Sequence, residues 1–447
     1  MSASIPRPDA LAVPGSSPMV PGVAYVNLGC RVNRVETDLI ADELARAGLE
    51  VLPEEEAQAV VINTCAVTAE AEAKARKAVR HAASLPQAPL VVATGCMANL
   101  FADELLALAP NVVVERDKSR VPTAVLDGLG VGALAVGDDG ELLAERIAHA
   151  TPTPTGRTRP GIKIQDGCDN RCGYCIVWKA RGVSRSVDAL RVRELVLCSL
   201  DRSASEVVLT GINLGVYRSP LPDGSKIELP GLLAWLLDTT PVGRIRLSSI
   251  EPPDVTPELA KTMAASHGRI APFLHICLQS GCDATLFRMA RIYDTVLFRT
   301  AVEQARSLLP QVSLGTDLIV GFPGETDEEF ERSLSFCREM GFSRMHVFRY
   351  SRRPGTPAAT APGQVDLHVM AARSARVRQL AREMREREAE RLVGREDLVC
   401  VQAPLRGVSG GLFDVMLDVE CPVDEMVPVC VTGVASDGTT LLGHVLA

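Results

Sequence analysis

Three cysteines within eight residues are the most informative feature of this chain, because thiolates spaced so closely can share one metal centre. Cys168, Cys172 and Cys175 stand in the run Gly-Cys-Asp-Asn-Arg-Cys-Gly-Tyr-Cys, with C-x3-C-x2-C spacing. Iron–sulfur cubanes are normally held by four Cys thiolates. Three thiolates can hold three irons and leave the fourth free to bind a substrate, as an open position on a catalytic metal does.

Two other uses of clustered cysteines fit this spacing less well. A zinc site usually has four ligands in two pairs, such as two C-x2-C units. Cys172 and Cys175 form one such pair, and no second Cys pair or His pair follows at zinc spacing. A disulfide is disfavoured because nothing marks the chain as secreted. The spacing therefore favours an iron–sulfur cluster over zinc.

Three more cysteines stand alone upstream, each in a similar setting. Cys30, Cys65 and Cys96 each follow a short Val-rich apolar run, which is typical of a buried parallel strand. The helical patterns that follow them cover residues 36–49, 69–83 and 100–109. In an open α/β sheet such strand-to-helix junctions lie along one edge, where ligands bind. A free Cys is most often a small buried hydrophobic residue, but three at equivalent junctions favour a shared ligand.

Further along the chain, strands and helices alternate as in the βα units of a parallel barrel. Strands are predicted at residues 162–164, 207–209, 244–248, 273–278, 312–320 and 344–350. Chemistry in such barrels lies at the C-terminal ends of the strands. That face should carry the cysteine loop together with Gly211, Glu251, Gln279 and Asp317. The fold expected for this region is a partial (β/α) barrel.

The last part of the chain is predicted to be all β. Short apolar runs at 398–401, 413–417, 427–431 and 441–445 are separated by Gly and Asp. Four or five short strands in about fifty-five residues indicate a small antiparallel barrel. Residues 392–447 hold two Arg against eight Asp and Glu. An acidic barrel of this kind is poorly suited to clamping an RNA backbone.

A chain of 447 residues is expected to form two or three domains, here of the α/β class. The expected order is an open parallel sheet, the partial barrel and the small β-barrel. The expected boundaries are 1–22 for a flexible leader, 23–148 for the sheet domain, 149–160 for a linker rich in Pro and Thr, 161–391 for the partial barrel and 392–447 for the small barrel.

The net charge of −8 conceals a basic region around the cysteine loop. Residues 157–200 contain nine Lys and Arg against four Asp and Glu, which suits an anionic substrate such as RNA. No apolar run reaches the length of a membrane span, and residues 1–22 lack the apolar core of a secretory signal. Thirteen cysteines in such a chain argue for reduced thiols in the cytoplasm.

The order of the cysteine motifs resembles that of the radical S-adenosylmethionine (SAM) methylthiotransferases. Asn-Leu-Gly-Cys30, Asn-Thr-Cys65 and Gly-Cys96-Met precede the C-x3-C-x2-C loop, and the resemblance runs from about Val23 to the C-terminus. It implies that the three upstream cysteines hold an auxiliary [4Fe-4S] cluster, which carries or donates sulfur. It also implies that the cysteine loop holds a second [4Fe-4S] cluster, which cleaves SAM to a 5′-deoxyadenosyl radical. The small barrel would then be the RNA-binding barrel called TRAM.

The family divides by substrate, which is a tRNA isopentenyladenosine, a tRNA N6-threonylcarbamoyladenosine or an aspartate of a ribosomal protein. The runs Leu209-Thr-Gly-Ile-Asn-Leu-Gly-Val-Tyr217 and Arg246-Leu-Ser-Ser-Ile-Glu-Pro252 look most like the threonylcarbamoyladenosine branch. That branch adds a methylthio group to C2 of the adenosine at position 37, just 3′ of the anticodon. Trp178 departs from the family pattern, which usually has Pro there. The other two substrates are alternatives, and a non-catalytic RNA-binding protein with structural zinc is a remote one.

The resemblance also implies contacts and partners. Tyr174 fits the aromatic position before the last cysteine of the loop, and the expected cofactor-binding residues are Tyr174, Gly211, Glu251, Gln279 and Asp317. Lys179 and Arg181, beside the cluster, are expected to contact the substrate. The expected partners are tRNA, SAM, a flavodoxin- or ferredoxin-like electron donor and an unspecified sulfur source. No residue is marked for acid–base catalysis.

Overall fold

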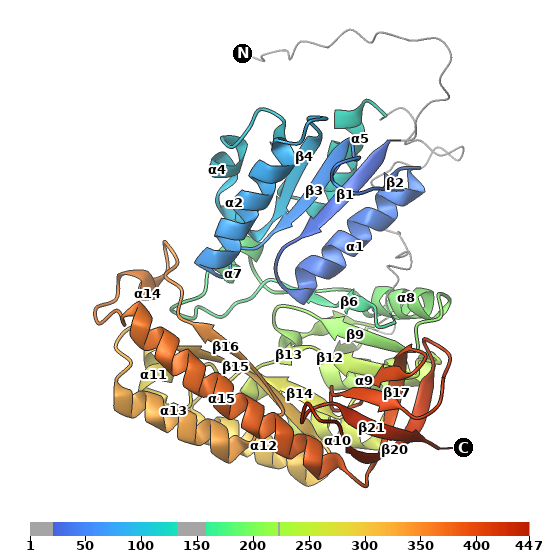
Figure 1. Cartoon of the computed structure of the whole chain (residues 1–447), viewed down its shortest axis with the longest axis vertical. Helices are drawn as coiled ribbons and strands as arrows, with labels where there is room; N and C mark the ends of the chain where they lie inside the picture. Colours follow the sequence, from blue (N-terminus) through green and yellow to red (C-terminus); the bar gives the residue numbers. More distant parts are fainter. Residues whose placement is uncertain (1–20, 132–157, 222–223, 447) are drawn as a thin grey trace.

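The computed structural model describes residues 21–131, 158–221 and 224–446. Figure 1 shows an N-terminal α/β domain, a larger barrel domain beneath it, and a small β-barrel beside the latter. This confirms the predicted fold class and the order of its parts. The predicted leader (1–22) and linker (149–160) lie mostly outside the described residues. Within the described ranges no helix combines the length and apolar composition needed to cross a membrane.

The N-terminal domain is a parallel five-stranded sheet with strand order β2-β1-β3-β4-β5. Its strands are β1 (Gly22–Asn27), β2 (Glu50–Val51), β3 (Ala59–Thr64), β4 (Leu90–Gly95) and β5 (Val112–Val114). Its helices are α1 (Arg31–Arg46), α2 (Ala69–Ala83), α3 (Cys96–Leu100), α4 (Ala102–Leu106) and α5 (Val121–Leu129), with a 3-10 turn at Lys118–Arg120. Every residue of β3 is buried, as expected at the centre of a sheet covered on both faces.

The helices of this domain differ in part from the sequence prediction. α2 covers the predicted residues, and its N-cap Thr68 accepts a hydrogen bond from the Ala71 amide at 3.1 Å. α1 begins five residues early, because Cys30 already occupies its extended N-cap position. The single helix predicted at 100–109 is wrong. The backbone of Phe101 (φ −136°, ψ 45°) leaves the helical region and separates α3 from α4.

The barrel domain contains two parallel sheets that continue into each other. One sheet has the order β12-β9-β6 and the other β13-β14-β15-β16. The strands are β6 (Gly161–Lys163), β9 (Glu206–Thr210), β12 (Arg244–Leu247), β13 (Ser249–Ile250), β14 (Phe273–Ile276), β15 (Ser313–Val320) and β16 (Arg344–Arg349). Only Ser248 separates β12 from β13, so the sheets form one curved wall. The predicted partial barrel is confirmed.

Helices cover the outside of this wall and bury an apolar core against it. They include α8 (Ala189–Leu200), α9 (Leu229–Thr239), α10 (Pro257–Ala265), α11 (Asp283–Arg288), α12 (Thr295–Leu308), α13 (Asp327–Met340) and α15 (Leu367–Leu392). The short helix α14 (Pro357–Thr360) follows β16, and α7 (Val177–Arg181) packs against the N-terminal domain. Two short antiparallel ribbons pair β7 (Gln165–Asp166) with β8 (Arg185–Ser186) and β10 (Arg218–Pro220) with β11 (Lys226–Glu228). The 3-10 turns are Leu214–Val216 and Pro252–Asp254.

The C-terminal strands close into a barrel of order β17-β18-β19-β21-β20. They are β17 (Glu396–Ala403), β18 (Arg406–Val408), β19 (Asp414–Leu417), β20 (Met426–Val434) and β21 (Leu441–Val445). The barrel is confirmed, but one pairing, β19 with β21, is parallel. The reason is that β20 pairs with β17 instead of β19. β21 then returns antiparallel to β20 and runs in the direction of β19.

A buried carboxylate joins the small barrel to the barrel domain. Glu206, at the start of β9, forms ion pairs with Arg244 and Arg246 of β12, and all three side chains are at most 1% exposed. Arg246 also donates to the backbone carbonyls of Ser409 (2.9 Å) and Gly410 (2.8 Å) in the small barrel. The acidic barrel is therefore docked on arginines of its neighbour, and Glu206 keeps two of these arginines paired.

Glu206→Gln should lower the free energy of unfolding by about 3 kcal/mol at pH 7, because it leaves two buried guanidinium groups short of a counter-charge. Burial alone would raise the pKa of Glu206, but Arg246 and Arg244 lower it from 4.5 to about 2. The wild type should therefore lose this stabilisation as pH falls from 4.5 towards 2, where the folded carboxylate takes up its proton. Urea unfolding at several pH values measures both effects.

Glu331→Gln is the matched control, since Glu331 pairs with Arg376 on the surface, where its side chain is 53% exposed. It should change the free energy of unfolding by less than about 1 kcal/mol. Equal stability of the two variants at pH 7 would contradict the assigned role of Glu206.

Candidate functional site

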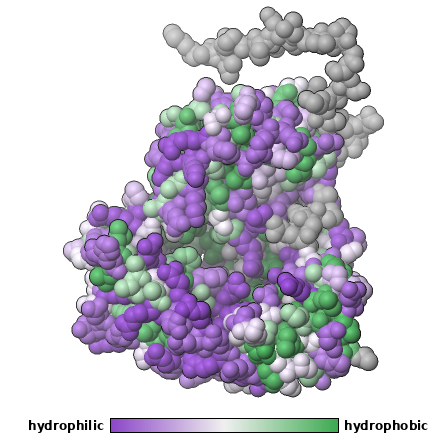
Figure 2. Space-filling model, viewed as in Figure 1, coloured by the Kyte–Doolittle hydropathy of each residue, from purple (hydrophilic) through white to green (hydrophobic). Residues whose placement is uncertain are grey.

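A cavity of about 750 Å³ lies between the N-terminal domain and the barrel domain. The space-filling view is hollowed between these two parts (Figure 2). The loops after β1, β3 and β4 line it from one side, and those after β9, β13 and β14 from the other. The ligand-binding edges of two parallel sheets thus face the same space. Leu412 of the small barrel contributes to the wall as well.

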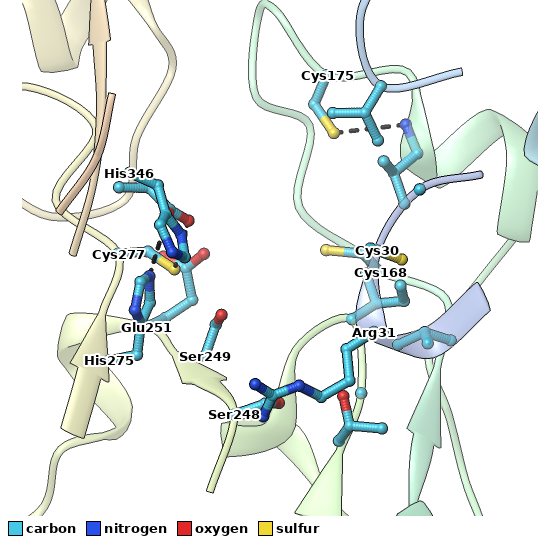
Figure 3. Close-up of a pocket in the computed structure, with 18 of the residues that line it drawn as sticks. Cys30, Arg31, Cys168, Cys175, Ser248, Ser249, Glu251, His275, Cys277 and His346 are labelled. Atoms are coloured by element: carbon cyan, nitrogen blue, oxygen red, sulfur yellow. Dashed lines mark hydrogen bonds and ion pairs between the residues drawn. The ribbon is translucent and has the colours of Figure 1, made fainter. Parts of the chain in front are cut away.

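All six predicted cluster cysteines line this cavity. Cys30 caps α1, Cys65 follows β3, and Cys96 opens α3. These three come together because β1, β3 and β4 are neighbours in the sheet. The second set, Cys168, Cys172 and Cys175, lies in the loop between β7 and α7. Figure 3 shows Cys30, Cys168 and Cys175 on the same side of the cavity.

The surroundings of these thiols fit iron–sulfur clusters. The amide of Val67 donates to Cys65 Sγ at 3.5 Å, and the amide of Val177 donates to Cys175 Sγ at 3.4 Å. Such N–H contacts to cluster sulfurs are one means by which proteins tune these centres. Burial raises the pKa of Cys65 to about 11 and that of Cys175 to about 12. A bound metal reverses this effect, because coordination deprotonates a thiol. Donor sets made of thiolates alone suit iron–sulfur clusters.

Arg291 is a functional candidate that the sequence analysis missed. It lies between α11 and α12, and its side chain is only 3% exposed. Its Nη1 donates to Cys172 Sγ at 3.0 Å and to the Tyr174 hydroxyl at 3.3 Å, while Nη2 pairs with Glu251. Burial raises the pKa of Glu251, and Arg291 opposes that shift. One guanidinium therefore connects a predicted cluster cysteine with two predicted cofactor-binding residues.

The five predicted cofactor-binding residues all line the cavity. Gly211 directly follows β9, and a Cβ there would lie 3.0 Å from Gln165. Gln165 accepts hydrogen bonds from the amides of Ile212 (2.9 Å) and Asn213 (2.8 Å) and donates to the Gly167 carbonyl (2.8 Å). It therefore ties the loop after β9 to the start of the cysteine loop.

Gln279 has a left-handed backbone (φ +64°), which is uncommon for a residue other than Gly, Asn or Asp. Its amide donates to the Asp317 carbonyl at 2.8 Å, and its own carbonyl accepts from the Ile319 amide at 2.9 Å. These bonds fix the turn after β14 against β15. Strained backbone of this kind is often found at functional sites.

Asp317 lies between two histidines that the sequence analysis also missed. Asp317 Oδ1 is 3.1 Å from both His275 Nε2 and His346 Nδ1. Burial alone would raise the pKa of Asp317, but the two imidazoles lower it well below the usual range. The three ligand atoms lie within 4.8 Å of one another, close enough to share a cation. His275 and His346 come from β14 and β16, the two neighbours of β15, so only the sheet order could have revealed them.

The two predicted substrate contacts already have protein partners. Lys179 Nζ donates to the Gly355 carbonyl at 2.6 Å and lies 5.2 Å from the ring centre of Trp178. The guanidinium of Arg181 lines the cavity, yet it bonds to Glu36 (2.9 Å), Asp166 (2.9 Å) and Asn33 (2.7 Å). Its side chain is 2% exposed. Their contact with substrate stays a prediction.

Comparisons with known proteins match the two domains that carry the six predicted cluster cysteines. Residues 22–115 match a family described as uncharacterized protein family UPF0004, and residues 162–337 match the radical SAM superfamily. A solved structure of the radical SAM methyltransferase TsrM from Kitasatospora setae, with cobalamin and a [4Fe-4S] cluster bound, aligns with a TM-score of 0.52. It is 16% identical and covers 76% of this chain and 77% of that one, which supports the fold alone.

Curated relatives match most of the chain. A Thermotoga maritima protein named threonylcarbamoyladenosine tRNA methylthiotransferase MtaB is 35% identical over 392 residues, which are 87% of this chain and 88% of that one. A Bacillus subtilis protein of the same name is 36% identical over 351 residues, which are 78% and 77%. With these relatives, both domain matches and two three-cysteine sets around one cavity, the chain belongs to the radical SAM methylthiotransferase family.

Proposed function

We propose that this enzyme transfers a methylthio group to C2 of N6-threonylcarbamoyladenosine at position 37 of tRNA. The observation that carries the proposal is the placement of both three-cysteine sets around one cavity in a member of this family. The substrate branch is supported by the names of the curated relatives and by the wording of the motifs after β9 and around β12.

When bound, SAM and the two [4Fe-4S] clusters supply the radical and sulfur chemistry of this transfer. We assign Cys30, Cys65 and Cys96 to the auxiliary cluster, and Cys168, Cys172 and Cys175 to the cluster that takes SAM. The remaining residues of the site hold, orient and shield these groups. Apolar side chains such as Val32, Phe273 and Leu412 line the same cavity and limit the access of water to reactive groups.

The cofactor-binding assignments follow from the position of these residues on the wall of the cavity that the cysteines line. Glu251 and Asp317 place carboxylates on the barrel side of the cavity, and Tyr174 lies within the cysteine loop, where Arg291 bonds to its hydroxyl. Gly211 and Gln279 contribute backbone at the ends of β9 and β14. Lys179 and Arg181 are retained as proposed substrate contacts. To contact RNA, Lys179 would give up its hydrogen bond to the Gly355 carbonyl. Arg181 would contact RNA while it remains paired with Glu36 and Asp166.

The proposed domains are 23–148 for the auxiliary cluster, 161–391 for the SAM-dependent chemistry and 392–447 for the TRAM-like barrel. We place the reaction in the cytoplasm, where tRNA and reduced thiols are found. A flavodoxin- or ferredoxin-like protein is the proposed electron donor, and the sulfur source is a further partner of unassigned identity.

Nucleoside analysis tests the substrate. The anaerobically reconstituted enzyme should convert threonylcarbamoyladenosine in tRNA to its 2-methylthio derivative, measured by liquid chromatography and mass spectrometry of digested RNA. tRNA carrying isopentenyladenosine should react at least about 100-fold less efficiently, because the two N6 substituents differ in charge and hydrogen bonding. A ribosomal-protein aspartate should not react.

Preferential modification of the isopentenyl tRNA or of the ribosomal protein would reassign the substrate branch. Protein that contains zinc in place of iron and leaves SAM intact would overturn the enzymatic proposal as a whole.

Cys172→Ala should release no 5′-deoxyadenosine from SAM, because one of three ligands of the SAM-binding cluster is lost. Iron should fall from about eight to about four atoms per chain, since the auxiliary cluster keeps its ligands. Cys198→Ala, in α8 and outside the cavity, is the matched control and should keep both the iron and the cleavage. Cleavage of SAM by the Cys172 variant would refute the assignment.

Cys65→Ala should abolish methylthio transfer while keeping part of the SAM cleavage, because it removes a ligand of the other cluster. Iron analysis and electron paramagnetic resonance should show one remaining cluster of about four irons. Methylthio transfer at the wild-type rate would exclude an auxiliary cluster at Cys30, Cys65 and Cys96.

A further inference from the structure

Two arginines reach the cavity without a partner of their own. Arg31 opens α1 beside Cys30, and Arg344 opens β16; both line the cavity and both are exposed to it. Among the described residues neither side chain has a hydrogen bond or an ion pair. Figure 3 shows Arg31 extending across the cavity towards Ser248. We call the part of the wall formed by Arg31, Arg246, Ser248, Arg344 and Leu412 the floor.

The floor carries an excess of positive charge. Burial lowers the pKa of Arg31, and the neighbouring charges of Arg159, Arg246 and Arg344 lower it further, with only Glu206 opposing them. That carboxylate already serves Arg246 and Arg244. A group of like charges around a desolvated space is stabilised by an anionic ligand.

A buried hydroxyl without a partner lines the same cavity. Ser248 Oγ is buried and makes no hydrogen bond among the described residues. A buried polar atom normally has a partner, and leaving it without one is costly. The Ser248 hydroxyl therefore indicates a polar ligand beside the two arginines.

We propose that Arg31 and Arg344 form a carboxylate-binding subsite that recognises the threonyl carboxylate of the substrate nucleoside. The inference rests on the proposed function and adds the residues that select its substrate. Arginine suits this task, because its planar fork can pair with both oxygens of a carboxylate. An isopentenyl group carries no charge and would leave both guanidinium groups unpaired in a partly desolvated space, so the subsite also selects against it.

The position of the floor favours the threonyl carboxylate over two other anions, which are the carboxylate of SAM and the phosphates of RNA. In the proposed function SAM, with its carboxylate, would be held at the cluster assigned to Cys168, Cys172 and Cys175. RNA phosphates remain with the backbone when an enzyme extrudes a base into an interior pocket. Leu412 and Arg246 form part of the floor, and Arg246 is held there by its bonds to Ser409 and Gly410 of the small barrel. A group carried on the base is therefore the anion that reaches Arg31 and Arg344.

The test compares two anticodon stem-loop RNAs that differ in a single charge. One carries threonylcarbamoyladenosine and the other its methyl ester, which keeps the shape and removes the carboxylate. The holoenzyme should bind the acid at least about 10-fold more tightly than the ester by fluorescence anisotropy, the size expected for a charged hydrogen bond. Arg344→Gln should bind the acid about 10-fold more weakly and the ester as the wild type does.

Arg349→Gln is the matched control, since Arg349 ends the same strand and lies outside the cavity wall; it should keep the wild-type preference. Arg344→Lys keeps the positive charge but loses the planar guanidinium. Its affinity for the acid stem-loop should lie between those of the wild type and Arg344→Gln. Equal binding of acid and ester by the wild type would overturn the subsite. The same conclusion follows if Arg344→Gln weakens both RNAs equally, which is the behaviour of a phosphate contact.

The outcomes separate the subsite from the function on which it rests. Methylthiolation of the acid stem-loop with no discrimination against the ester would leave the proposed function in place and refute the subsite. A wild-type enzyme that methylthiolates neither RNA but acts on the isopentenyl stem-loop would refute the function, and the subsite with it.

Discussion

The arrangement of the site depends on one buried carboxylate. Glu36 in α1, 3% exposed, accepts from Lys163 of β6 at 2.8 Å, from Arg181 of α7 at 2.9 Å and from Lys118 at 2.9 Å. Burial alone would raise its pKa, but these cations hold it well below the usual range. α1 begins directly after Cys30. β6 precedes the loop that carries Cys168, Cys172 and Cys175, and α7 follows that loop. A single ionic cluster therefore sets the position of one cysteine set relative to the other. Removing one partner would leave uncompensated buried charges, at a cost of about 3 to 5 kcal/mol.

A second link follows the same principle. Arg353, 1% exposed and located after β16, pairs with Glu72 in α2. Helices α1 and α2 each follow a strand and a cysteine that we assign to the auxiliary cluster, so each link holds a helix whose N-terminal end borders the cavity. The cavity is bounded by two domains that are tied by charge, by buried hydrogen bonds and by Ile176 and Ala180, which pack into the apolar core of the N-terminal domain. Interfaces of this kind keep a fixed geometry while leaving the space between them open to ligands.

The sequence predicted those parts of the site that short spacing or strand-end position determines. The cysteine loop is contiguous, and Cys30, Cys65 and Cys96 could be placed together because parallel neighbours share an edge. Arg291, His275 and His346 could not be found in this way. Each acts through a partner about thirty residues or more away, and no local pattern marks an arginine or histidine as buried. The parallel pairing of β19 with β21 was missed for a related reason, since it depends on the distant pairing of β20 with β17. The break at Phe101 is a single-residue backbone change that helical periodicity does not reveal.

The net charge of −8 conceals that the barrel domain and the small barrel differ in their distribution of charged residues. The small barrel is acidic, yet Arg244 and Arg246 of the barrel domain enter it and are bound by its backbone carbonyls at Val408, Ser409 and Gly410. Its docking therefore depends on carbonyl dipoles and on Glu206, and its surface acids are free to remain in water. A barrel held in this way contributes Leu412 to the cavity wall, and its acidic composition does not offer the positive surface that an RNA backbone requires. Of the arginines that line the cavity, Arg31 and Arg344 have no protein partner among the described residues. The proposed subsite therefore places positive charge inside the reaction cavity, where it would act on the modified base and not on the RNA backbone.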